Sequence, residues 1–180
     1  TETMGLNLQR DRLCLVQLSN GDGNTHLVQI ESIQKPAPNL CKLLCDTTIL
    51  KLFHFGRFDI AVLLQTFGVL TSPVYCTKIA SKLVRTYTDK HGLKNLIQEL
   101  LEIDISKHQQ SSDWGAKNLT NSQIEYAASD VLYLHSLKTK LDIILERESR
   151  VEFAKKCFEF LPTRAQLDLA GWPDTDLFSH

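Results

Sequence analysis

The sequence predicts an α/β fold in which a mixed sheet is covered by helices. Two strand-like segments, 12–18 and 26–30, flank Asn20-Gly21-Asp22-Gly23-Asn24, a strong turn signal that is typical of a β-hairpin. Further along, strand-like and helical segments alternate, as they do where helices cover a sheet. With one more strand presumed to end at Glu2, we expect three antiparallel strands followed by strand–helix–strand–helices.

The start of the chain looks like an element entered partway. Thr1–Leu6 has no initiator methionine and no lead-in to the strand that ends at Glu2. We therefore expect further residues upstream, and a signal peptide among them stays open. From Thr1 onward, a chain of 180 residues is most simply one domain, and we expect 1–180 to form it.

A helix is predicted over Asn39–Cys45, where three leucines form one apolar side. Cys41 and Cys45 lie one turn apart in it, which is a spacing that metal sites use. No second Cys/His pair stands at ligand spacing, so packing in the core is the favoured interpretation. The five cysteines are odd in number and scattered through apolar segments, which favours reduced, buried thiols in a cytoplasmic protein over a disulfide framework.

The next strand is predicted over 49–55, and a helix follows Gly56 over 57–67. Asp59 lies in the first turn of that helix, where the helix dipole favours a negative charge, so it could be only a helix-start acid. However, open α/β sheets bind ligands just past the carboxyl ends of their strands. Asp59 is therefore also a candidate for function.

The rest of the chain is predicted to be mainly helical. After a short strand at 74–76 we expect helices at 77–84, 93–101, 123–134 and 152–160, the third of them continuing to about 145. Polar loops are expected at 85–91 and 107–114, and a less regular tail after Pro162. We find no internal repeat and no low-complexity segment.

Composition narrows the function classes. The hydrophobic fraction of 43% is ordinary for a globular protein, and no run is long enough to span a membrane, so no membrane partner is expected. The net charge of −1 excludes the global basic field that drives tight non-specific DNA binding. Any nucleic acid must therefore be held by local basic groups or by metal ions.

The helix at 123–134 carries the first chemical motif. Thr120 and Gln123 have the form of a capping box, and four-residue spacing places Tyr126 over Asp130 on one face. A phenol beside a carboxylate could hold a water molecule next to a metal ion. The alternative is a half-buried core tyrosine and a solvated charge, and this helix alone favours that alternative.

Three spaced motifs change that balance, because together they resemble the DEDDy 3′–5′ exonucleases of the ribonuclease D type. Thr1-Glu2-Thr3-Met4-Gly5-Leu6 matches the family's Asp-x-Glu-Thr-x-Gly-Leu from its second residue onward. His54-Phe55-Gly56-Arg57-Phe58-Asp59 matches the second motif, which ends in Phe-Asp after a strand. Tyr126-Ala127-Ala128-Ser129-Asp130 matches the third, Tyr-x-x-x-Asp, and Ser112-Asp113-Trp114 also looks like ribonuclease D.

The resemblance covers essentially the whole chain and implies a ribonuclease H-like fold with a two-metal-ion exonuclease site. It implies that Glu2, Asp59 and Asp130 hold two divalent cations, Mg²⁺ or Mn²⁺, and that Tyr126 orients the attacking water. Carboxylate oxygens suit such hard cations. The family's first aspartate would stand just before Thr1, so we expect it among upstream residues, and activity depends on it.

A closer likeness is to nanoRNase C, seen in 52–59, 107–114 and the tail at 161–172. It implies degradation of very short RNA, an alphaproteobacterial source and a homo-oligomer assembled as a ring-shaped octamer. Phe55 departs from the wider family, in which a small polar residue often follows the motif's histidine. The motifs bind the phosphodiester that RNA and DNA share, so the nucleic acid itself stays open.

Weaker candidates could bind the substrate. Met4 and Leu6 could pack against the terminal base, although Met4 could equally be core. His54 and Arg57 could contact a phosphate, although Arg57 could be a surface residue. The densest basic patch could bind the substrate backbone or be a solvated loop; it contains Arg85, Lys90, His91 and Lys94. A polar loop could line the site through Lys107, Gln109, Gln110 and Trp114.

Two function classes follow. The first is a metal-dependent 3′–5′ exonuclease that releases nucleoside monophosphates from short RNA. The second is a catalytically silent nucleic-acid-binding or scaffold module of the same fold. The first class predicts metal-dependent cleavage that is lost in Asp59→Asn or Asp130→Asn, and an aspartate just before Thr1 in the full gene would favour it over the second.

Overall fold

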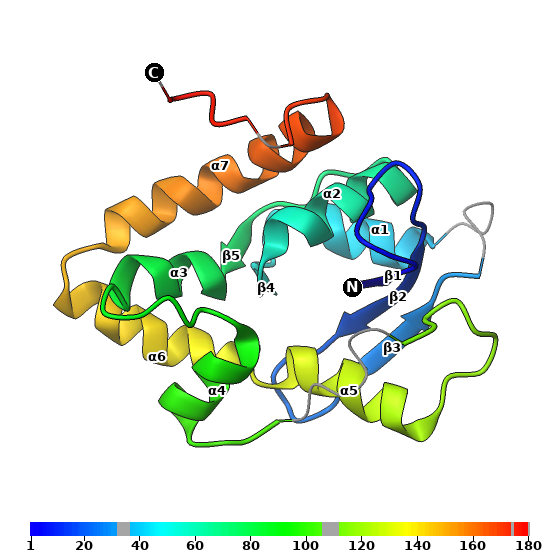
Figure 1. Ribbon diagram of the computed structural model, residues 1–180, viewed down its shortest axis with the longest axis horizontal. Coiled ribbons are helices and arrows are strands. Elements are labelled where there is room, and N and C mark those ends of the chain that lie inside the picture. Colours follow the sequence, from blue (N-terminus) through cyan, green and yellow to red (C-terminus); the bar gives the residue numbers. More distant parts are fainter. Residues whose placement is uncertain (32–36, 106–111, 174, 180) are drawn as a thin grey trace.

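The computed structural model describes residues 1–31, 37–105, 112–173 and 175–179 (Figure 1). It confirms the predicted α/β class, with antiparallel strands on one side of the molecule and a parallel pair near its centre. Among the described helices, none is both long and apolar enough to cross a membrane.

The antiparallel sheet contains β1 (Glu2–Thr3), β2 (Leu13–Leu18) and β3 (His26–Gln29), in that order. The predicted hairpin is confirmed, with Val16 opposite Val28, and Glu2 lies opposite Leu15 on the other edge of β2. The middle strand is buried over most of its length because helices cover it on both faces. Glu2 is thereby held beside a buried central strand.

The parallel sheet contains β4 (Lys51–Phe53) and β5 (Val74–Cys76). In the described residues the two sheets are separate hydrogen-bonded units, whereas one mixed sheet was expected. The strand predicted over 49–55 is shorter at both ends. Ile49 and Leu50 are exposed, and Phe55 adopts a left-handed backbone conformation (φ 64°) that starts the next helix.

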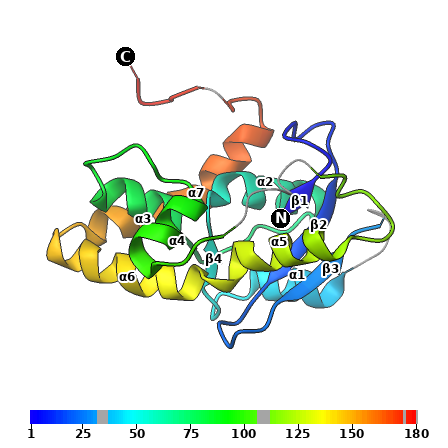
Figure 2. The same ribbon diagram turned by 60° about the horizontal axis from the view of Figure 1, so that its bottom comes forward.

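Helices surround both sheets (Figures 1 and 2). They are α1 (Pro38–Cys45), α2 (Gly56–Phe67), α3 (Thr77–Val84), α4 (Leu93–Leu101), α5 (Asn121–Leu132), α6 (Leu134–Arg147) and α7 (Val151–Leu169). One core cluster joins β2 to α1 and α2, a second joins α3, α4 and α6, and a third joins α2 and β5 to α7. A fourth, smaller cluster joins α5 to β2.

The long helix predicted over 123–145 is broken at Tyr133. Its backbone (φ −98°, ψ 0°) ends α5 and begins α6. Ala127 of α5 packs on β2, whereas Leu137 and Leu141 of α6 pack with α3 and α4. The break lets one continuous stretch of sequence serve two separate cores, which its periodicity alone does not reveal.

The irregular tail predicted after Pro162 is wrong, because α7 continues through this proline to Leu169. A proline inside a helix removes one backbone hydrogen bond and is normally costly. Here Leu161 and Ala165, on either side of it, are buried against α2 and β5, and this packing offsets the cost.

The five cysteines are free thiols, but the expectation that all are buried is also wrong. Cys14 and Cys76 lie in the core, Cys41 is half-buried, and Cys45 and Cys157 are exposed on α1 and α7. The helical positions of the last two face outward, which an apolar local sequence did not indicate.

Candidate active site

A cleft of about 790 Å³ lies between the antiparallel sheet, α2 and α5. Its lining includes Asp59 from α2, Tyr126 and Asp130 from α5, and His54 and Phe55 from the end of β4. In Figure 1 the first residue of the chain lies in the same central region, beside β1. The cleft thus receives side chains from elements far apart in the sequence.

Helix α5 is fixed by the capping box that the sequence predicts. The Gln123 backbone N–H donates to Thr120 Oγ1 at 3.3 Å, and the Thr120 N–H donates to Gln123 Oε1 at 2.9 Å. Ala127 is fully buried against Cys14 and Leu15 of β2, so the helix approaches the sheet closely. This contact aims Tyr126 and Asp130, one residue before it and three after, into the cleft.

The other two acids come from β1 and α2, where Asp59 lines the cleft and Glu2 lies close to Asp59 and Asp130. Asp59 Oδ1 accepts hydrogen bonds from the Thr1 amino group at 3.0 Å and from Thr1 Oγ1 at 2.6 Å. Glu2, the next residue, accepts a hydrogen bond from Gln17 Nε2 of β2 at 3.1 Å. A group attached to the Thr1 nitrogen would therefore lie within reach of Asp59.

The carboxylates share one electrostatic environment. Burial raises the pKa of Glu2 to about 7, with the Thr1 amino group opposing the rise and Asp130 adding to it. Burial also raises the pKa of Asp130 to about 6, and the negative charge of Asp59 adds to that rise. Carboxyl groups that influence one another in this way are costly to ionise together without a cation.

Tyr126 and Asp130 interact as the four-residue spacing predicts. The phenol donates a hydrogen bond to the Asp130 carboxylate, and burial together with that negative charge raises the pKa of Tyr126. Tyr126 therefore stays protonated at neutral pH. Trp114 packs behind it, with ring centroids 5.9 Å apart, and is itself 3% exposed. Trp114 thus supports the tyrosine from the core and does not line the cleft.

The acidic residues of the site are of the type that binds a hard divalent cation. Carboxylate oxygens are the ligands that Mg²⁺ and Mn²⁺ prefer. As they stand, no three His, Cys, Asp or Glu side chains in the described parts of the chain are arranged to hold a metal ion.

His54 lies in the cleft as a neutral acceptor. Thr77 Oγ1 donates to Phe53 O at 3.2 Å, so at the 3.0 Å contact between His54 Nδ1 and Thr77 Oγ1 the imidazole is the donor. Burial lowers the pKa of His54 to about 4, and the nearby charge of Lys78 contributes. The side chain therefore offers Nε2 as an acceptor and carries no positive charge toward a phosphate.

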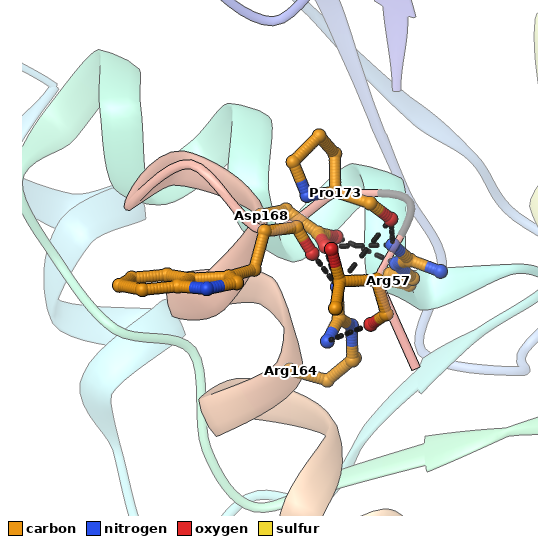
Figure 3. A network of polar contacts seen from close by, with 6 residues as sticks. Arg57, Arg164, Asp168 and Pro173 are labelled. Atoms are coloured by element: carbon orange, nitrogen blue, oxygen red, sulfur yellow. Dashed lines mark hydrogen bonds and ion pairs between the residues drawn. The ribbon is translucent and has the colours of Figure 1, made fainter. Parts of the chain in front are cut away.

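Arg57 points away from the cleft, toward α7 (Figure 3). Its Nε and Nη2 donate to the two carboxylate oxygens of Asp168 at 2.6 and 2.7 Å, and Nη2 also donates to Pro173 O. Arg164 donates to the same carboxylate at 2.7 Å and to Trp172 O. Two arginines and one buried aspartate thus tie the first turn of α2 to the end of α7.

The predicted basic patch is not a continuous surface. Arg85 is 1% exposed, and its guanidinium binds Glu99, Ser81 Oγ and the Lys90 carbonyl. The interpretation of Arg85 as a surface grip is therefore wrong: local sequence shows its charge but not its burial.

Other predicted residues differ in their placement. Lys90 is exposed, and His91 Nδ1 contacts Ser81 Oγ at 2.9 Å. Lys94 lines the cleft and pairs with Asp104 at 3.0 Å. Met4 and Leu6 are exposed on the loop after β1, outside the cleft lining. Lys107, Gln109 and Gln110 lie outside the described residues.

Sequence reasoning missed Lys78, which lines the cleft from the first turn of α3. Its position resembles that of Asp59, since each follows a strand of the parallel sheet and begins a helix. The rule that placed Asp59 at the carboxyl edge of the sheet could have found Lys78 as well. His135 and Asn20 are further cleft residues without a motif to mark them.

Comparisons with known proteins show the family to which the chain belongs. A family model described as 3′–5′ exonuclease matches residues 1–146. Ribonuclease D of Gluconacetobacter diazotrophicus is 35% identical over 144 residues, which make up 78% of this chain and 35% of that protein. The chain spans 35% to 39% of the length of three such ribonuclease D relatives.

Solved structures of exonucleases also match this chain. NrnC of Brucella melitensis matches with a TM-score of 0.98 and 62% identity, over 100% of this chain and 87% of that one. That protein has also been solved with bound Mg²⁺ and bound to pGG. RNase D of Escherichia coli, an exoribonuclease involved in structured RNA processing, matches with a TM-score of 0.76 and 29% identity, over 91% of this chain and 44% of that one. The chain therefore belongs to the 3′–5′ exonuclease family, among its ribonuclease D-type members and with a close likeness to NrnC, a nanoRNase C.

Proposed function

We propose that this protein is a divalent-metal-dependent 3′–5′ exonuclease that releases nucleoside monophosphates from short RNA. The observation that carries the proposal is that Asp59, Asp130 and Tyr126 line one cleft and that Glu2 lies close enough for its charge to act on theirs. These residues come from three elements, and a merely structural role would not require three partly buried acids to influence one another. Hydrolysis of a phosphodiester uses such a cluster.

Each residue has a role that its environment supports. Glu2, Asp59 and Asp130 would hold two divalent cations, Mg²⁺ or Mn²⁺, with an aspartate expected just before Thr1. When bound, the cations supply charge neutralisation at the phosphate and activation of water. The protonated Tyr126 hydroxyl, beside Asp130, would orient the attacking water. His54 Nε2 would accept a hydrogen bond from a substrate hydroxyl.

Short RNA is the substrate class we favour. A related protein, NrnC of Brucella melitensis, has been solved with pGG, a short nucleotide. A net charge of −1 supports the contact of few phosphates, since long strands are usually held by many cations. DNA is the alternative, because the acidic residues act on the phosphodiester that both polymers share.

The likeness to nanoRNase C supports a homo-oligomer, and we propose the ring-shaped octamer of that family with 1–180 as one domain. We place the protein in the cytoplasm, where its five free thiols would stay reduced. Light scattering of the purified protein tests the assembly, and a monomer would contradict it.

Cleavage assays test the activity. The full-length gene product is incubated with 5′-labelled RNAs from a dinucleotide to about twenty nucleotides, a range that brackets single-strand site sizes. Each reaction is run with Mn²⁺, with Mg²⁺ and with EDTA, and matched DNAs are run in parallel. We expect metal-dependent shortening from the 3′ end, fastest on the dinucleotide RNA.

The variants Asp59→Asn and Asp130→Asn should abolish cleavage while the protein stays folded. Cleavage retained in both variants would contradict the enzyme proposal. Equal trimming of long and short strands would keep the exonuclease and overturn the preference for short RNA. Binding of RNA without cleavage, in the full-length protein with either metal, would favour the silent binding module.

A further inference from the structure

Gln17 is a polar residue in an otherwise apolar, buried strand. The six residues of β2 are Leu-Cys-Leu-Val-Gln-Leu, and the glutamine among them is 6% exposed. A buried amide lowers the stability of a protein unless its donor and acceptor groups are hydrogen-bonded. An apolar side chain of similar size would fill this position without that cost, so packing alone does not account for the glutamine.

The amide of Gln17 is only half satisfied. Nε2 donates to Glu2 Oε1 at 3.1 Å, and an ionised carboxylate can only accept, so this contact fixes which end of the amide faces Glu2. Oε1 of Gln17, at the other end, is buried and has no hydrogen-bond partner among the described residues. The hydrogen bond to Glu2 is therefore the interaction that accounts for a buried amide at this position.

The sheet directs both side chains toward α5. Glu2 lies opposite Leu15, and side chains directly opposite one another project from the same face of a sheet. Gln17 follows Leu15 by two residues, so its side chain projects from that face as well. Helix α5 packs on Leu15 through Ala127 and carries Asp130 one turn further along. Gln17 and Glu2 thus lie on the side of the sheet that faces the candidate active site.

The hydrogen bond holds one oxygen of Glu2 and leaves the other available. Gln17 binds Oε1 of Glu2, whereas Oε2 has no hydrogen-bond partner in the described part of the chain. The charges of Asp59 and Asp130 act on Glu2, so its carboxylate lies near both acids. A carboxylate that is already fixed in direction binds a cation with a smaller loss of conformational freedom than one that rotates freely.

We propose that Gln17 is a positioning residue, which holds the Glu2 carboxylate in the direction that a divalent cation requires and thereby sets the affinity of the site for that cation. Gln17 acts through Glu2 and not on the RNA. The inference rests on the proposed exonuclease function and deepens it, because it names a residue outside the three sequence motifs that controls the loading of the same site.

Calorimetric titration of the full-length protein with Mn²⁺, in the absence of RNA, tests the inference. Gln17→Met keeps an unbranched side chain of similar length and removes the amide. We expect the Kd for Mn²⁺ to rise about tenfold, as is typical when a group that orients a metal ligand is lost. In EDTA the variant should melt no lower than the unmodified protein, because the unpaired acceptor is removed too. A merely structural role predicts the opposite, a lower melting temperature and an unchanged Kd.

Gln29→Met is the matched control. Gln29 is exposed, lies opposite Leu15 on β3 and donates to Ala116 O, so the same substitution is made on the edge of β2 that is remote from Glu2. It should leave the Kd for Mn²⁺ unchanged. Gln17→Leu, a second apolar variant, should raise the Kd as Gln17→Met does. In cleavage assays both Gln17 variants should need about tenfold more Mn²⁺ for half-maximal rate, with an unchanged KM for RNA at saturating Mn²⁺.

Three results would overturn the inference. They are an unchanged Kd for Mn²⁺ in both Gln17 variants, an equal rise of the Kd in Gln29→Met, and a lower melting temperature of both Gln17 variants in EDTA. Failure of the proposed function itself is distinguishable from these results, because the unmodified protein would then cleave no RNA with either metal, whatever the variants bind.

Discussion

Two buried carboxyl groups make the stability of the folded protein depend on pH. In the folded state the pKa of Glu2 is raised to about 7 and that of Asp130 to about 6, above the ordinary values for these residues. The folded state therefore binds these protons more tightly than the unfolded state does. Their contribution to stability is fully present below about pH 4 and is lost as pH rises through 6 and 7.

We predict that the metal-free protein loses stability between pH 5 and pH 8, and that Asp130→Asn reduces this loss. The variant should have a melting temperature at pH 8 about 2–4 °C above that of its parent in EDTA, because one buried charge is gone. Glu125→Gln, an exposed acid on the same helix, is the control and should change little. Equal pH profiles for Asp130→Asn and its parent would contradict the prediction.

Tyr126 is predicted to act in the chemical step. Tyr126→Phe keeps the ring against Trp114 but removes the hydroxyl that donates to Asp130. We expect kcat to fall by about 100-fold, while the metal-induced rise in melting temperature is kept. Steady-state kinetics and thermal melting with Mn²⁺ measure the two effects. A loss of the metal effect together with activity would instead assign a structural role to this hydroxyl.

At the scale of elements, the end of α7 supports the first turn of α2. Asp168, with a side chain 5% exposed, receives Arg57 and Arg164 (Figure 3). Asp168→Asn would leave two guanidinium groups without their shared charge. We predict a loss of about 1–3 kcal/mol in the free energy of unfolding by urea, reduced because Arg57 is partly exposed.

The same variant should weaken metal binding, because Arg57 and Asp59 lie on one helical turn. Glu159→Gln is the control, since Glu159 is an exposed acid of α7 whose pair with Lys156 contributes little. If Asp168→Asn and Glu159→Gln unfold at the same urea concentration, the contact between α2 and α7 does not carry this stability.

Elements were predictable from sequence where local signals were complete. The helices 77–84 and 93–101 and the strand 74–76 are found as predicted, since each has a clear pattern and clear ends. The break at Tyr133 and the passage of α7 through Pro162 were not predictable, because contacts with distant elements decide both.

The site residues, like the elements, were predictable only where a local sequence signal marks them. The positions of Asp59, Tyr126 and Asp130 were predictable because two motifs mark them, and in the structure all three line one cleft, with Glu2 near them. Arg85 was assigned wrongly because sequence shows charge and not burial. Lys78 was missed because a single lysine has no motif, although its place after β5 was available from the order of elements.

For the whole molecule, the candidate ligands come from β1, α2 and α5, so binding of cations connects distant parts of the chain. We predict that saturating Mn²⁺ raises the melting temperature by about 5–10 °C, as expected when ligand exceeds its Kd about 100-fold. Differential scanning fluorimetry with and without EDTA measures this rise. It should be absent in Asp59→Asn, and a rise of equal size there would place the metal elsewhere.

The break at Tyr133 has a consequence for local opening of the protein. Helix α5 is held by a cluster of four described buried residues, whereas the cluster that holds α6 has nine. The backbone amides of α5 should therefore exchange with deuterated water faster than those of α6, although the two helices are consecutive. Because α5 carries Tyr126 and Asp130, occupancy of the cleft should slow exchange in α5 and leave α6 almost unchanged.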